Sequence, residues 1–359
     1  MKIAIVSPLM VTVPPKKYGG IELIIDELAR GLSQKGHQIT VFCCGGSTIE
    51  QEYITRVETS PYPTREHIEE NRQWELNQLL TVLGRQGDFD IIHFNYEPAV
   101  FRFDIDGVAI NLLDFFITPV ALTFHNTTSI QSNIEYYQGT KSLHRHEMIF
   151  VSENQRRPVS FFPNSNVVYN ALPIEDFPLE NKKDNYMLFL GRITPFKGIL
   201  EAIEVAQKTK IPLVIVAKVD PVDQDFYDKE VKDKIDGELV RYVGEADFVG
   251  KTNYLKKAKC LLFPILWEEP FGLVMTEALA CGTPVVAFRR GSVLEIIQDG
   301  INGFVVSNVE EMVEAVDRVD QISAQKCRES VEKRFSVKRM VGEYEDVFVS
   351  TIQKNKAIK

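Results

Sequence analysis

The chain has 359 residues, which corresponds to about two domains of ordinary size. Its 44% apolar and 25% charged residues are typical of a soluble globular protein and exclude disordered, collagen-like and coiled-coil chains. The net charge of −9 provides no long-range attraction to nucleic acid or to anionic lipid, so we expect no nucleic-acid partner.

Membrane-spanning and secretion signals are not expected either. No apolar stretch reaches the roughly 18 residues of a membrane span, and the N-terminal run KIAIV is followed by no small-residue cleavage site. This run therefore predicts a first β-strand. The cysteines are scattered and include no CxxC pair, which favours reduced thiols in a cytoplasmic protein.

The first half of the chain alternates short apolar runs with helical patterns. Apolar residues from Ile21 to Leu32 recur at helical spacing, and Gly36 ends this pattern. A second helix is predicted over 67–85. Such helices between buried runs are typical of a parallel, doubly wound sheet. Strands are predicted at 2–8, 38–44, 89–95, 119–125, 148–152 and 166–170.

A segment rich in proline and charge, 171–185, separates this half from a second half with the same alternation. We therefore predict one domain at 1–170, a second at 171–335 and a helical tail over 336–359. In the second half, strands are predicted at 186–192, 212–218, 238–244, 260–265 and 283–288, and helices at 198–209, 253–258 and 272–282.

Two glycines, Gly19 and Gly20, stand between the first strand and the first helix. Glycine permits a positive φ and a close approach of the backbone, and a helix N-terminus offers free N–H groups and the positive end of its dipole. The pair therefore fits a phosphate-binding loop. A tight strand-to-helix turn explains the same residues equally well.

Two cations, Arg192 and Lys197, lie on the loop that follows the strand at 186–192, between Gly191 and Gly198. A guanidinium fork and a compact ammonium group together suit a diphosphate. The alternative is that both side chains are simply solvated.

A third candidate group surrounds the helix predicted at 272–282. Glu269 precedes this helix, Gly272 opens its first turn and Glu277 lies within it. The free N–H groups at its start could hold a phosphate, and Glu277 could bind the vicinal diol of a ribose. The alternative makes Glu269 a cap-like acid and Glu277 a half-exposed helix residue.

Three blocks resemble the retaining nucleotide-sugar glycosyltransferases of family 4, namely YGGIE, GRITPFKG and EPFGLVMTEALACGTPVVAFRRGSVLEIIQDGINGF. The resemblance implies the GT-B fold, in which two Rossmann-like, doubly wound α/β domains face each other across a cleft. It also implies that 1–170 binds the acceptor, that 171–335 binds the nucleotide-sugar donor, and that the helix within 336–359 crosses back to the first domain.

The resemblance implies a role for each candidate residue. Arg192 and Lys197 would bind the donor diphosphate, Glu277 the nucleotide ribose and Glu269 the transferred sugar. His125, at the end of the strand at 119–125, would lie near the anomeric centre and complete the catalytic set with Glu269, Arg192 and Lys197. Further donor contacts are implied for Gly19, Gly20, Val243 beside the base, Phe271, Gly272, Leu273 and Val274.

Two candidates remain open between different roles. The family more often has a glycine-containing loop where this chain has Lys218-Val219-Asp220, so Lys218 either adds a donor contact or pairs with an acid. His93, at the end of the strand at 89–95, is a second histidine of the same kind as His125.

These observations predict a hexosyltransferase that uses a nucleotide sugar and retains the anomeric configuration. The favoured donor is UDP-glucose. The resemblance implies no metal ion and no other cofactor. The acceptor is an unidentified small molecule, glycan or lipid-linked compound, and a lipid acceptor would imply transient membrane association. The alternatives are a GDP-mannose-dependent mannosyltransferase, a sugar-nucleotide epimerase and a non-catalytic nucleotide-sugar-binding protein.

Overall fold

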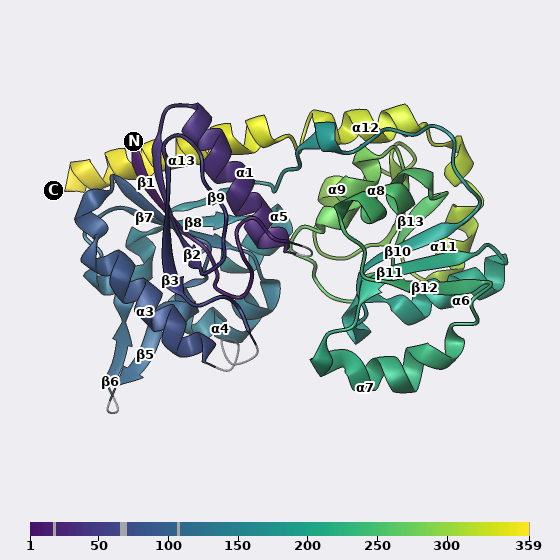
Figure 1. Ribbon diagram of the computed structural model, residues 1–359, viewed down its shortest axis with the longest axis horizontal. Helices are drawn as coiled ribbons and strands as arrows, with labels where there is room; N and C mark the ends of the chain where they lie inside the picture. The colour runs from purple at the N-terminus through teal and green to yellow at the C-terminus, as the bar shows by residue number, and fades with distance from the viewer. Residues whose placement is uncertain (17–18, 65–69, 106–107, 359) are drawn as a thin grey trace. The chain divides into compact units, whose positions relative to one another are not determined.

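The computed structural model describes most of the chain, namely residues 1–16, 19–64, 70–105 and 108–358. Residues 67–69, where the second predicted helix would start, lie outside the described residues. The chain forms two compact units (Figure 1). The first comprises Met1–Ala171 and Val337–Lys359, and the second comprises Leu172–Ser336. The first unit is thus discontinuous in sequence, because the last helix returns to it.

The first unit contains a parallel sheet, whose strands are β1 (Lys2–Val6), β2 (Gln38–Cys44), β3 (Ile54–Ser60), β4 (Ile91–Phe94), β7 (Val120–Phe124), β8 (Glu147–Phe150) and β9 (Ser165–Val167). In the described residues their order is β3-β2-β1-β4-β7-β8-β9. Every residue of β4, β7 and β8 is buried, which explains their continuous apolar runs. The order reverses between β1 and β4, and the loops after such strands form a binding crevice in open α/β sheets.

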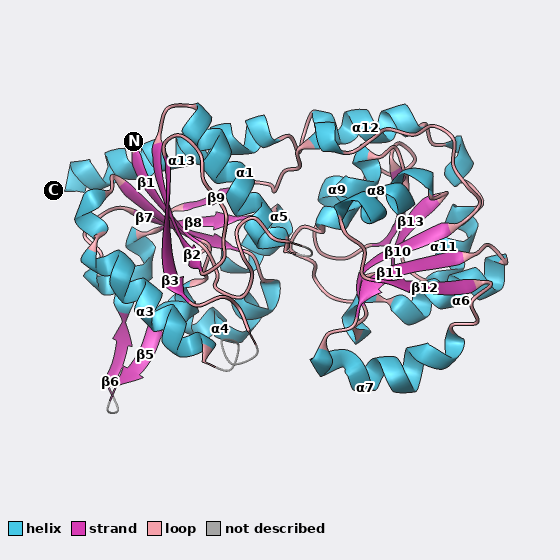
Figure 2. Ribbon diagram, viewed as in Figure 1, coloured by secondary structure: helices cyan, strands magenta, loops and turns pink. Residues whose placement is uncertain are grey.

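Helices flank this sheet (Figure 2). Leu79 and Val82 of the α3 helix pack with Ala4 and Val6 of β1 in the core. The α-helices described in this unit are α1 (Gly20–Gln34), α3 (Asn71–Gly84), α4 (Thr127–Gly139), α5 (Glu153–Arg156) and α13 (Val337–Ile358). Single-turn 3₁₀ helices occupy Gln86–Asp88, Pro98–Phe101, Leu112–Phe115, Lys141–Arg145 and Arg157–Val159. An antiparallel hairpin, β5 (Arg102–Ile105) and β6 (Val108–Asn111), extends from this unit.

Helix α13 packs closely on the rest of the first unit. A Cβ atom on Gly31 of α1 would lie 2.3 Å from Val341, so only glycine lets the two helices approach this closely. The Tyr344 hydroxyl lies 3.2 Å from the Thr123 hydroxyl, which lies 2.7 Å from Nε2 of His93. His93 is fully buried beneath α13, and this burial assigns it to the core rather than to a site.

The burial of His93 beneath α13 can be tested through the pH dependence of stability. Desolvation lowers the pKa of His93 from 6.5 to about 3, so the unfolded state binds more protons between these values. The contribution of His93 to stability is therefore complete above pH 6.5 and decreases as the pH falls. We expect urea titrations from pH 6.5 to 5 to show a free energy of unfolding that falls more steeply in the wild type than in His93→Gln, by a slope difference that grows to about 1.4 kcal/mol per pH unit near pH 5. Parallel profiles would contradict a buried neutral imidazole.

The second unit contains a second parallel sheet, whose strands are β10 (Met187–Arg192), β11 (Leu213–Lys218), β12 (Val240–Gly244), β13 (Cys260–Phe263), β14 (Val285–Phe288) and β15 (Gly303–Val306). Their order is β12-β11-β10-β13-β14-β15 in the part of the chain that the structure describes. The order again reverses beside its first strand, between β10 and β13. The carboxyl ends of β10, β11 and β13 thus meet at one edge.

The helices of the second unit are α6 (Ile199–Thr209), α7 (Gln224–Phe226), α8 (Phe248–Lys257), α9 (Leu273–Ala280), α10 (Val293–Ile296), α11 (Val309–Val316) and α12 (Ala324–Glu332). Single-turn 3₁₀ helices occupy Ile174–Asp176, Pro195–Lys197, Pro221–Asp223, Lys232–Lys234 and Val319–Gln321, and a π-helical turn occupies Tyr227–Val231. The core includes Phe189 of β10, Ile203 of α6 and Met312 of α11.

Two further expectations from the sequence concern the whole chain. All of the cysteines are buried, and none forms a disulfide. Among the described residues, no helix combines the length and the apolar character that crossing a bilayer requires.

Candidate active site

Two of the predicted cations end neighbouring strands of the second unit. Arg192 closes β10 and Lys218 closes β11, where the two residues are paired in register. Asp220 binds both of them, with Lys218 Nζ at 2.8 Å and Arg192 Nη1 at 3.3 Å. Burial alone would raise the pKa of Asp220. The hydrogen bonds and charges of Lys218 and Arg192 outweigh this effect, so the pKa of Asp220 lies below its ordinary value. Of the two roles left open for Lys218, the structure therefore shows the pairing with an acid.

Arg192 has unused hydrogen-bonding capacity. Its Nε atom is buried and has no partner among the described residues. A buried guanidinium donor without a partner is unfavourable, so an anionic ligand that reached it would gain a strong hydrogen bond.

Lys197 is placed by a tight turn after β10. Thr194 caps the Pro195–Lys197 turn by accepting a hydrogen bond from the Phe196 amide at 3.2 Å. Gly198 then adopts a left-handed conformation, with φ of +75°, and is the N-cap residue directly before α6. A Cβ atom at Gly198 would lie 1.8 Å from the carbonyl oxygen of Pro264, so the turn requires glycine.

The ammonium of Lys197 meets Glu269, although the two residues were selected from separate motifs. Lys197 Nζ lies 2.6 Å from Glu269 Oε2. The indole N–H of Trp267 donates to the same oxygen at 2.7 Å, and Lys197 Nζ lies 5.4 Å from the centroid of the Trp267 ring. Trp267 was missed in the sequence, although it stands only two positions before Glu269.

The loop that carries Glu269 is anchored by the turn after β14. The Gly291 amide donates to Glu268 Oε2 at 2.9 Å, and the Ser292 amide donates to the Glu269 carbonyl at 3.1 Å. The Ser292 hydroxyl donates to the carbonyl of Phe271 at 2.6 Å. Phe271 itself is buried and packs edge to face on Phe335, so its side chain belongs to the core.

Gly272 is the N-cap residue directly before α9, has a left-handed conformation with φ of +82°, and offers no side chain to cap this helix. The amides of Leu273 and Val274 find no acceptor among the described residues. A Cβ atom at Gly272 would lie 3.5 Å from Cγ of Glu269. The uncapped start of α9 and the Lys197–Glu269 pair are therefore adjacent.

Glu277 is buried on α9, so the alternative of a half-exposed helix residue is wrong. Its Oε1 atom lies 2.6 Å from Nζ of Lys251, which comes from α8. Lys251 could not be selected from the sequence, because nothing in the local pattern indicates which acid on another helix it contacts.

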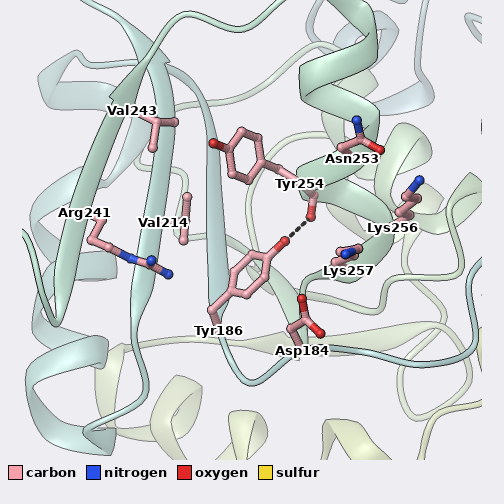
Figure 3. Close-up of a pocket in the computed structure, with 9 residues that line it drawn as sticks. All are labelled: Asp184, Tyr186, Val214, Arg241, Val243, Asn253, Tyr254, Lys256 and Lys257. Carbon is pink, nitrogen blue, oxygen red and sulfur yellow. Dashed lines mark hydrogen bonds between the residues drawn. The ribbon is translucent and has the colours of Figure 1, made fainter.

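Val243 lies on β12 with a half-exposed side chain. It borders a recess of about 510 Å³ between β11, β12 and α8 (Figure 3). The Tyr186 hydroxyl donates across this recess to the carbonyl of Tyr254 at 2.7 Å. The α8 residues that line it, from Asn253 to Lys257, belong to the C-terminal half of the helix, away from Lys251.

In the first unit, Gly19 precedes α1 and Gly20 is its first residue. Neither glycine lies in the left-handed region of positive φ, and Gly19 is extended, with φ of 176°. A Cβ atom at Gly19 would instead lie 2.6 Å from Pro15, so close packing explains this glycine. Glu22, in the first turn of α1, is a buried acid that the sequence analysis missed, and burial raises its pKa to about 7.

His125 follows β7 in the first unit. Its Nε2 atom lies 3.0 Å from Oδ1 of Asn95, whose Nδ2 donates to the carbonyl of Val6 at 3.2 Å. This orientation of the Asn95 amide places the imidazole proton on Nε2 and the lone pair on Nδ1. Burial lowers the pKa of His125 to about 4, so the ring is neutral at pH 7 and can act as a hydrogen-bonding group but not as a cation.

The described residues contain no group of three or more His, Cys, Asp and Glu side chains that could hold a metal ion. The metal independence of the reaction stays a prediction.

Family models match both units of the chain. Residues 18–172 match "Glycosyltransferase Family 4", and residues 173–335 match "Glycosyl transferases group 1". The chain belongs to the family 4 glycosyltransferases. Sugar transfer is therefore its general activity, as the resemblance implied.

Similar proteins agree with this assignment. The glycosyltransferase is 28% identical to an uncharacterized glycosyltransferase of Methanocaldococcus jannaschii, over 89% of each chain. It is 25% identical to the phosphatidyl-myo-inositol mannosyltransferase of Mycobacterium tuberculosis, over 85% of this chain and 82% of that one. The crystal structure of HepE from Anabaena in complex with UDP and glucose superposes with a TM-score of 0.75 at 18% identity, over 98% of this chain and 100% of that one. The predicted GT-B fold with two Rossmann-like domains is confirmed.

Proposed function

We propose that this glycosyltransferase transfers a hexose from UDP-glucose to an acceptor, with retention of the anomeric configuration and without a metal ion. The observation that carries the proposal is the adjacency of Lys197, Glu269 and the uncapped start of α9. A cation and free amides beside a carboxylate suit a sugar diphosphate, whose anionic and hydroxyl groups need donors and acceptors side by side.

In the proposed reaction, the bond between the anomeric carbon and the phosphate oxygen breaks, and its electron pair stays on the diphosphate. Lys197, Arg192 and the amides of Leu273 and Val274 stabilise this developing charge, which is the largest contribution to catalysis that such groups can make. A new bond forms between the anomeric carbon and the acceptor oxygen on the same face. The acceptor proton passes to the departing phosphate oxygen, so no protein base is required.

Three carboxylate and imidazole groups would orient the donor. Glu269, held by Lys197 and Trp267, would contact the hydroxyls of the transferred sugar, and Glu277 would bind the ribose. His125 is neutral and presents the Nδ1 lone pair, so its proposed contact with the sugar accepts a hydroxyl proton in a hydrogen bond. This role is positional and does not require proton transfer.

The second candidate is mannosyl transfer from GDP-mannose, which is favoured by the mannosyltransferase among the relatives. That relative is named for a phosphatidyl-myo-inositol substrate. By analogy, the proposed acceptors include lipid-linked compounds as well as small molecules and glycans. A lipid-linked acceptor would bring the protein into transient contact with a membrane.

Calorimetric and thermal-shift titrations with UDP, GDP and ADP test the donor. We expect UDP to stabilise the protein by about 2.7 kcal/mol at a hundredfold excess over its Kd. Binding of GDP alone would favour the mannosyltransferase, and binding of none of the three would contradict the proposal.

The chemistry is tested by incubating UDP-glucose with the protein. Slow release of UDP that is unchanged by EDTA supports the metal-independent reaction, and NMR of the first-formed sugar product shows whether the anomeric configuration is retained. Appearance of an epimeric UDP-sugar without acceptor would instead indicate an epimerase.

A further inference from the structure

The contact between Lys251 and Glu277 compensates a buried charge. The Glu277 side chain is only 5% exposed and that of Lys251 is 22% exposed, with 2.6 Å between Nζ and Oε1. A carboxylate this far from water requires a paired, hydrogen-bonded cation. Because Lys251 lies near the start of α8 and Glu277 lies on α9, the contact depends on how these two helices pack.

Two aromatic rings restrict the ammonium of Lys251. Nζ lies 5.9 Å from the ring centroid of Phe177 and 5.5 Å from that of Phe248. The two rings pack edge to face, with centroids 5.3 Å apart. Aromatic faces attract a cation and exclude water, so Lys251 is held on the Glu277 side.

The second oxygen of Glu277 is available to a ligand. Lys251 occupies Oε1, whereas no hydrogen bond joins Oε2 to another of the described residues. A carboxylate fixed at one oxygen presents the other in a defined direction. The cis-diol of a ribose donates two hydroxyl protons and matches such an acceptor.

We propose that Lys251 is a positioning residue for nucleotide recognition, which fixes the Glu277 carboxylate so that it accepts hydrogen bonds from the donor ribose. This inference rests on the proposed function, in which Glu277 binds that ribose. It makes Lys251 a determinant of the preference for ribonucleotides over 2′-deoxyribonucleotides. A purely structural contact between α8 and α9 would give no such preference.

Calorimetric titration of the full-length protein with UDP and 2′-deoxy-UDP tests the inference. We expect the wild type to bind UDP about tenfold more tightly than 2′-deoxy-UDP. In Lys251→Met, UDP binding should weaken about tenfold while 2′-deoxy-UDP binding changes little, so that the preference is lost. Lys251→Arg keeps the cation and should restore most of it.

Lys326→Met is the matched control, because it removes the same charge from an exposed position on α12, another helix of the second unit. It should leave the preference unchanged. In a Glu277→Gln background, Lys251→Met should cause no further loss of UDP affinity, since Lys251 acts through the carboxylate. An additive loss would overturn the inference.

The outcomes separate the inference from the proposed function. If the wild type binds none of the nucleotides, the proposed function fails and the role of Lys251 fails with it. If the wild type prefers UDP, and Lys251→Met retains that preference while its melting temperature falls, only the inference fails. If GDP is the ligand, the same comparison is made with 2′-deoxy-GDP and has the same two outcomes.

Discussion

Replacing Lys197 by alanine is expected to lower kcat about 100- to 1,000-fold, with a smaller change in the donor KM. The ammonium lies 2.6 Å from Glu269, beside the uncapped start of α9, where the proposed leaving group would gain its charge. A preorganised donor aimed at developing charge contributes more in the transition state than in the ground state. Steady-state release of UDP from the sugar donor measures this effect.

Lys208→Ala is the matched control for this substitution. Lys208 lies on α6, is exposed and pairs with Glu204 and Glu310, so its loss removes the same charge from a solvated position. We expect its kcat to stay within about twofold of the wild type. If Lys197→Ala were equally active, Lys197 would have no part in stabilising the leaving group.

Gly198→Ala is expected to destabilise the protein by about 3 kcal/mol. The substitution combines a left-handed backbone, with φ of +75°, and a Cβ atom 1.8 Å from the Pro264 carbonyl oxygen. Conformational strain and overpacking each cost about 1–3 kcal/mol. Urea denaturation followed by circular dichroism measures the change, and the remaining folded protein should also show a reduced kcat because Lys197 is the preceding residue.

Gly342→Ala provides the contrast. Gly342 lies inside helix α13, and a Cβ atom there would have no neighbour within 4 Å. Alanine in such a position is expected to stabilise the helix by about 0.5–1 kcal/mol. Equal urea midpoints for Gly198→Ala and Gly342→Ala would contradict the close packing of the Lys197 turn.

Strands β13 and β14 could be predicted because every one of their residues is buried, so their apolar runs are continuous. Strand β12 was also predicted, although it mixes buried, half-buried and exposed residues. Strand β3 was missed because its sequence ITRVETS mixes exposed and buried positions at the sheet edge. Strand β15 was missed because it starts with a glycine, Gly303, a residue type that is depleted in strands.

In the candidate site, the residues that could be predicted differ from the others in their position relative to the strands. Arg192, Lys197 and Gly272 could be selected because loops after the strands of a doubly wound sheet carry the ligand contacts, so their position in the sequence was informative. Lys251 could not be selected, because its partner lies on another helix and only tertiary packing brings the two together. Asn95 could not be selected either, because its role is to bind the imidazole of His125. The two residues come together only because the strands that precede them, β4 and β7, are neighbours in the sheet.

The discontinuity of the first unit affects the order in which the protein can form on the ribosome. Helix α13 contributes Tyr344 and Phe348 to the buried surroundings of His93, yet it is synthesised after every residue of the second unit. The nascent first 171 residues therefore leave an apolar surface exposed while the second unit, whose chain is continuous, can already fold. The first unit can therefore be completed only after α13 has been synthesised, whereas the second unit needs no residue beyond Ser336.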